Sequence, residues 1–102
     1  MKVYNKLVRD NIIDIIKDKW EKVEFHFADK NEYWNKLKEK LQEEILEVLE
    51  EDDIIGELAD VMEVIYAICE FKNIDFQEIE KIRKEKIKQR WWFTKKIILE
   101  KA

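Results

Sequence analysis

Apolar residues recur at helical spacing through the middle of the chain. Residues 54–71 are apolar almost all round, which is typical of a helix at the centre of a bundle or at a subunit interface. Asp52 and Asp53 separate this region from the one before it and offer N-caps, as Asp29 or Asn31 does for the earlier helix. In that earlier helix one core-facing stripe repeats at steps of three and four: Trp34, Leu37, Leu41, Ile45 and Val48.

Two shorter helices are expected on either side. Residues 12–20 form an amphipathic pattern, with Asp10 as the expected N-cap. The last helix begins at Asp75, where Glu78 three residues later completes a capping-box pattern. The sequence therefore predicts about four helices.

One short strand is also expected. Residues 23–27 alternate apolar and polar side chains, which is typical of a strand. Residues 97–99 favour an extended tail that could pair with it. We therefore predict an all-α fold, a helical bundle of about four helices with a small β element, in a single domain over residues 1–102.

Composition agrees with long helices in one domain. The 102 residues are 46% hydrophobic and 43% charged, with one glycine and no proline. Cys69 is the only cysteine and lies in an apolar stretch, so we expect it to be buried, with no internal disulfide. Neither a secretory signal nor a membrane-spanning stretch is visible, and we expect a cytoplasmic protein.

Charge is segregated along the chain. Between Lys40 and Lys72 there are eleven acidic residues and no basic one, whereas residues 81–101 carry nine basic residues against Glu85 and Glu100. An acidic centre beside a basic flank suits a cation together with a polyanion. Binding to nucleic acid alone is disfavoured, because the acidic centre would repel phosphates.

Four of these acids stand out because they border the apolar stripes. Glu44 and Glu47 lie three residues apart on one expected helix, and Glu57 and Asp60 lie three apart on the next. No basic residue of the same helix lies within a turn or two of Glu57 and Asp60. Around Glu47, like charges four residues apart repel one another, and no local basic residue is expected to offset that repulsion. Carboxylates at an apolar interface are unfavourable unless they are paired.

A hard divalent cation would pair them, and Mg²⁺, with Mn²⁺ as a substitute, prefers oxygen ligands and recruits phosphates. Solvation of the acids, or pairing with Lys and Arg of the last helix or of another subunit, is the open alternative. A ferritin-like di-iron site is disfavoured, because the only histidine, His26, lies in the expected strand.

The ordered acidic motif resembles a known superfamily. Glu43-Glu44-Ile45-Leu46-Glu47 followed by Glu57-Leu58-Ala59-Asp60 is similar to the EExxE…ExxD signature of the MazG-like, all-α nucleoside triphosphate pyrophosphohydrolases. Residues 4–10, 25–29 and 95–99 resemble a small branch described as phosphoribosyl-ATP pyrophosphohydrolase-like or house-cleaning enzymes. The likeness spans nearly the whole chain.

The resemblance implies a magnesium-dependent enzyme that cleaves between the α- and β-phosphates, giving a nucleoside monophosphate and pyrophosphate. It implies that Glu44, Glu47, Glu57 and Asp60 hold the metal, that Glu47 orients the attacking water and that Glu43 supports it. It further implies phosphate contacts from four basic residues and a homodimer or homotetramer. These basic residues are Lys6, Arg9, Lys86 and Arg90.

Two departures from the branch put substrate preference in question. Ile13 stands where a proline is usual, and Trp91-Trp92 replaces a pair of glycines. Phosphoribosyl-ATP hydrolysis is an alternative activity, and a non-catalytic helical module that binds a protein partner is an alternative of another class.

Overall fold

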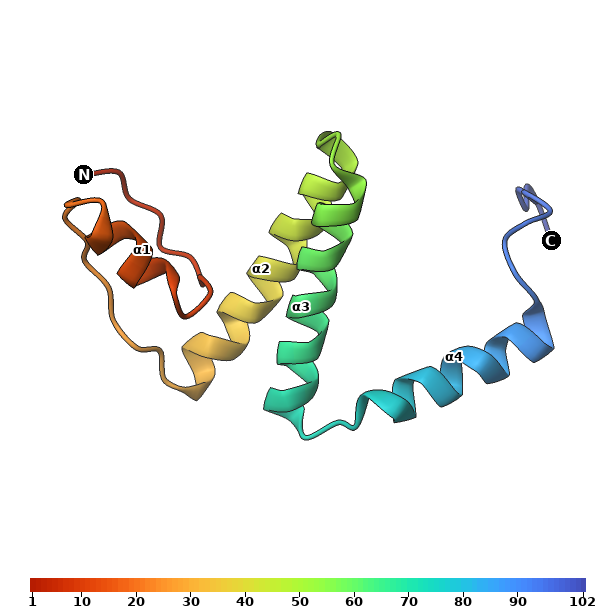
Figure 1. The fold of residues 1–102 in the computed structure, drawn as a ribbon. Coiled ribbons are helices and arrows are strands. Elements are labelled where there is room, and N and C mark those ends of the chain that lie inside the picture. The colour runs from red at the N-terminus through yellow and green to blue at the C-terminus, as the bar shows by residue number, and fades with distance from the viewer.

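The computed structural model describes residues 1–102 and consists of four helices and no strand (Figure 1). The helices are α1 (Ile12–Asp18), α2 (Lys30–Glu50), α3 (Ile54–Lys72) and α4 (Phe76–Arg90). The all-α class and the number of helices agree with the prediction. None of the helices has the length and apolar character needed to cross a membrane.

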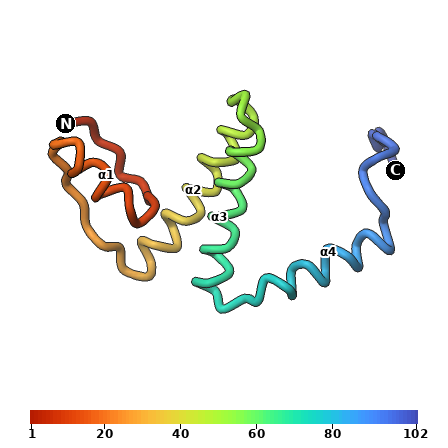
Figure 2. Tube along the Cα trace, in the orientation of Figure 1, coloured from red at the N-terminus to blue at the C-terminus, as the bar shows by residue number.

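The centre of the fold is an antiparallel hairpin of α2 and α3, the only two helices packed along their lengths (Figure 2). Each begins at an aspartate that caps it. The Asp29 side chain accepts a hydrogen bond from the Glu32 backbone N–H at 2.8 Å, and the Asp53 side chain accepts one from Gly56 N–H at 3.1 Å. These local caps fix where the two helices start, and the Asp53 cap lies in the turn between them.

Between α2 and α3 lies a small core. Leu37, Val64 and Cys69 are buried, so the prediction that Cys69 is buried is confirmed. At the end of the hairpin opposite the α2–α3 turn, the rings of Trp34 and Phe71 stack with centroids 5.9 Å apart. The expected stripe on α2 is wrong at Ile45, which is 45% exposed, whereas its neighbour Glu44 is buried.

α4 follows the hairpin after a sharp change of direction. Asn73 adopts a left-handed conformation, φ 55°, and closes α3. Asp75 caps α4 as predicted, but its side chain accepts from Gln77 N–H at 2.9 Å, not from the backbone of Glu78. Beyond the Phe76 ring, 4.6 Å from that of Tyr66, α4 runs away from the hairpin (Figure 1).

The predicted β element is absent. Residues 23–27 form no strand, and residues 91–102 lie at the opposite end of the molecule (Figure 2). A strand needs the backbone of a neighbour to satisfy its hydrogen bonds, and no extended neighbour is present. α1 also starts one residue later than predicted, with Asn11 rather than Asp10 at its N-cap.

The chain is open in shape. Its radius of gyration is 18.0 Å, whereas a compact domain of this length has about 13 Å. Its accessible surface is 9738 Å², against about 6,200 Å² for a compact monomer of the same mass. Much apolar surface on α3, on α4 and after α4 is therefore uncovered in a single chain.

Candidate metal centre

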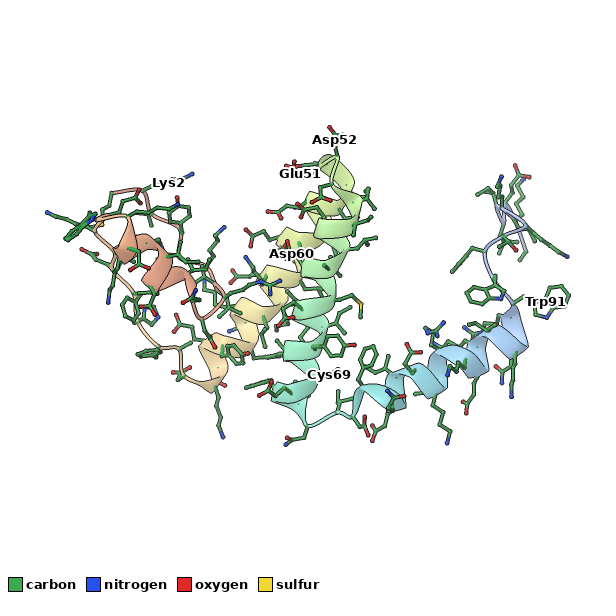
Figure 3. The ribbon with its side chains drawn as sticks, in the orientation of Figure 1. Lys2, Glu51, Asp52, Asp60, Cys69 and Trp91 are labelled. Carbon is green, nitrogen blue, oxygen red and sulfur yellow. The ribbon has the colours of Figure 1, made fainter.

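Four carboxylates gather where α2 and α3 face each other. One oxygen from each of Glu44, Glu47, Glu57 and Asp60 lies within 4.8 Å of the others. Residues three apart share one face of a helix, and the antiparallel hairpin turns the pair on α2 toward the pair on α3. The structure thus brings together all four residues that the sequence singled out as metal ligands; Asp60 is labelled in Figure 3.

The cluster contains two buried oxygen atoms without a partner. Glu44 is only 6% exposed, and its Oε2 receives no hydrogen bond. Oε2 of Glu57 is likewise buried and unpaired. An orphaned carboxylate oxygen in a protein interior is unfavourable by roughly 1–3 kcal/mol or more. A cation among these oxygens would remove that cost.

Burial and crowding of the acids both affect the pKa values of Glu44 and Glu47. Burial raises the pKa of Glu44, helped by its contact with the Glu47 carboxyl and opposed by Lys40. For Glu47, its contact with the Glu44 carboxyl lowers the pKa, but contact with Glu57, desolvation and the charges of Glu57 and Glu43 outweigh it and raise the pKa. Both shifts mean that the folded chain disfavours negative charge at this point.

Lys40 partly offsets the acids of α2, contrary to the expectation that nothing local does. Its Nζ lies 3.0 Å from Oε2 of Glu43 and 3.3 Å from Oε1 of Glu44. Desolvation opposes the shift in Glu43, but hydrogen bonds from Lys6 and Lys40 lower its pKa. Glu43 is therefore a paired anion outside the four-carboxylate cluster.

The N-terminal segment supplies the other neutralising charges. Lys6 Nζ donates to Glu43 Oε1 at 2.9 Å, and Arg9 Nη2 donates to Asp60 Oδ1 at 2.8 Å. Between this segment and α2 lies an open cavity of about 250 Å³. The residues that line this cavity include three lysines: Lys6, Lys36 and Lys40. Lys36 and Lys40 were not among the predicted site residues, although Lys40 lies three and four residues before Glu43 and Glu44, a spacing that brings side chains together on a helix.

The remaining predicted phosphate-binding residues lie elsewhere. Lys86 and Arg90 are on α4, which diverges from the hairpin, so one chain does not bring them to the carboxylates (Figure 1). Trp91, labelled in Figure 3, follows α4 with φ 69°, a left-handed backbone conformation that favours glycine. This is one of the two positions where the resembled branch has glycine.

The donor set fits a hard divalent cation. All four groups are carboxylates, two of their oxygens lack any partner, and no sulfur or imidazole is among them. Searches against protein-family models, curated proteins and solved structures found no match to this chain.

Proposed function

We propose that this protein is a metal-dependent nucleoside triphosphate pyrophosphohydrolase that releases pyrophosphate and a nucleoside monophosphate. The observation that carries the proposal is the convergence of Glu44, Glu47, Glu57 and Asp60, with two buried oxygens unpaired. The order of these residues along the chain, and its resemblance to the MazG-like signature, selects this reaction among those that use carboxylate-bound Mg²⁺.

Each residue of the site has a proposed task. The four clustered carboxylates would hold Mg²⁺, or Mn²⁺ in its place; bound metal neutralises phosphate charge and lowers the pKa of a coordinated water. Glu47, whose pKa is raised, would orient the attacking water and accept its proton. Glu43 would act behind it by holding Lys6 and Lys40 in place.

The cations of the N-terminal segment and α2 would meet the phosphate chain. Lys6, Lys36 and Lys40 line a cavity directly beside Glu43. Amines act as point charges toward phosphate, while the guanidinium of Arg9 is able to bind it in a bidentate manner. Lys86 and Arg90 could contribute only from a second copy of the chain.

We also propose that the protein is a homo-oligomer. The surface of one chain exceeds that of a compact monomer by about 3,500 Å², whereas a standard interface removes about 800 Å² per partner. A second copy has the chemistry needed to cover this surface, because the exposed part of α3 is largely apolar and α4 carries basic residues that could face the acidic part of α3.

The decisive experiment is a pyrophosphate-release screen over natural and modified nucleoside triphosphates and phosphoribosyl-ATP, with Mg²⁺ and with EDTA. We expect Mg²⁺-dependent release that Glu57→Gln lowers by more than about 100-fold, since even residues that only support metal ligands typically cost about 10–100-fold. Glu70→Gln, on the same helix but outside the cluster, is the matched control and should retain activity.

The screen also separates the alternatives. Preference for phosphoribosyl-ATP would assign the same site to that substrate. Absence of pyrophosphate release from every compound would overturn the enzymatic proposal and favour the non-catalytic module.

A further inference from the structure

Arg9 reaches into the metal centre from far away in the sequence. Its Nη2 donates to Oδ1 of Asp60 at 2.8 Å, and its Nη1 lies 3.9 Å from Oε2 of Glu63. The pair with Asp60 joins positions 51 residues apart. Asp60 is one of the four clustered carboxylates, so Arg9 and a bound cation would share this carboxylate.

The segment that carries Arg9 is held in place by several contacts. Lys36 Nζ donates to the Asn5 backbone carbonyl at 2.7 Å, and Lys6 pairs with Glu43. At its other end the Arg9 carbonyl accepts from Ile12 N–H at 3.1 Å, which ties the segment to the start of α1. Residues 5–9 therefore form a strap that crosses the hairpin from Glu43 on α2 to Asp60 on α3.

This strap is built so that it can be displaced. The Arg9 and Asp60 side chains are 57% and 41% exposed, and exposed ion pairs contribute only about 0.2–1 kcal/mol. A divalent cation bound to Asp60 repels a guanidinium within hydrogen-bond distance of the same carboxylate. The Arg9 guanidinium and the cation therefore compete for the Asp60 carboxylate, and the doubly charged ion is the stronger competitor.

Building on the proposed function, we propose that Arg9 is an internal competitor of the metal at Asp60. In the ligand-free protein Arg9 neutralises Asp60; when the cation binds, Arg9 leaves that carboxylate and becomes available to the phosphates of the substrate. The strap thus couples metal binding to the presentation of a phosphate-binding guanidinium, and it regulates the occupancy of the site.

The test measures metal binding without nucleotide. Mn²⁺ affinity is determined by titration calorimetry on the full chain and on Arg9→Ala. Because a competitor has been removed, we expect Arg9→Ala to bind Mn²⁺ about two- to tenfold more tightly. Arg83→Ala is the matched control, since Arg83 forms a comparable pair with Glu80 on α4 at 2.8 Å, away from the cluster, and its affinity should not change.

A second background separates competition at Asp60 from a general effect of charge. In Asp60→Asn, Arg9 keeps only its 3.9 Å contact with Glu63, which lies outside the four-carboxylate cluster, so adding Arg9→Ala should leave Mn²⁺ affinity unchanged. An equal gain in both backgrounds, or unchanged or weaker binding by Arg9→Ala, overturns the strap. Failure of every variant to bind Mn²⁺ also overturns it, together with the metal site. Tighter Mn²⁺ binding without any nucleotide hydrolysis supports the strap while rejecting the proposed reaction.

Discussion

Glu44 is the residue at which burial and charge conflict most directly. It is nearly inaccessible to solvent, its Oε2 has no partner, and its pKa is raised above 4.5 mainly by desolvation. A raised carboxyl pKa in the folded state adds stability below pH 4.5 that is lost as the pH rises through the raised value. The metal-free fold should therefore be less stable at neutral pH than the same fold with the acid protonated.

Replacing Glu44 by glutamine tests this conflict. We expect Glu44→Gln to raise the unfolding free energy of the metal-free protein at pH 7 by about 1 kcal/mol, because the buried charge is removed. The same substitution should abolish the stabilisation that Mg²⁺ gives the wild type, since a ligand is lost. Thermal unfolding with EDTA and with MgCl₂ measures both effects, with Glu70→Gln as control. Loss of stability in EDTA would show that the Glu44 charge is already well compensated by Lys40.

Among individual residues, the sequence predicted the clustered carboxylates better than the basic residues that pair with them. Glu44 and Asp60 each lie three residues from another acid on the same helix, so helical spacing alone placed them on shared faces. The Lys40 pairs were equally local and could have been predicted. The Arg9–Asp60 pair could not, because it depends on how the N-terminal segment crosses the hairpin.

At the scale of elements, the turn between α2 and α3 depends on one side chain. Asp53 caps α3 through Gly56 N–H, and Gly56 is the only glycine of the chain. A Cβ at position 56 would collide with the Asp53 carboxylate, so the glycine leaves room for the cap. The sharp start of α3 determines where Glu57 and Asp60 point.

A double-mutant cycle tests this cap. Asp53→Ala should cost about 1 kcal/mol of stability, as loss of an N-cap usually does. Gly56→Ala should stabilise the Asp53→Ala variant by up to about 1 kcal/mol, from helix propensity, but give little or no gain in the wild type, where it displaces the cap. Urea unfolding of the four proteins supplies the cycle. Equal effects of Gly56→Ala in both backgrounds would show that the two residues are independent.

Helices were predicted well from sequence because their signals are local. Starts at Asp29, Asp53 and Asp75 follow from caps and apolar spacing, which need only neighbouring residues. The prediction of a strand at residues 23–27 was wrong because alternation of apolar and polar residues is not sufficient for a strand. A strand also needs a partner strand, which must come from a distant segment. Trp91 shows the same limit, since nothing local predicts a left-handed tryptophan.

At the scale of the whole molecule, α3 has one face with no partner in the chain. Ile55, Leu58 and Met62 are exposed by 85%, 48% and 38%. Their spacing places them on the side of α3 opposite the carboxylates. The apolar pattern of residues 54–71, which runs almost all round the helix, predicted a central helix or one at a subunit interface, but periodicity within one chain does not say which face meets a second copy.

Charging this face should separate the copies. We expect the wild type to have the mass of an oligomer, and Leu58→Glu with Met62→Glu to yield a species of one chain, 12.6 kDa, with reduced helical content. Light scattering after size exclusion and circular dichroism measure the two effects. Gln42→Glu adds a charge to an exposed position of α2 without removing apolar surface, and should leave the oligomer intact. A wild type of 12.6 kDa that unfolds cooperatively would contradict the oligomer.

The short turn of the α2–α3 hairpin has a consequence for how the centre forms. Every clustered carboxylate lies between Glu44 and Asp60, so closing one brief connection brings all of them together. Closing such a connection has a small entropic cost, and contacts between near neighbours form early in folding. Negative charges then meet before the remainder of the chain has settled, and a cation present at that moment would act as a template for the first folded structure.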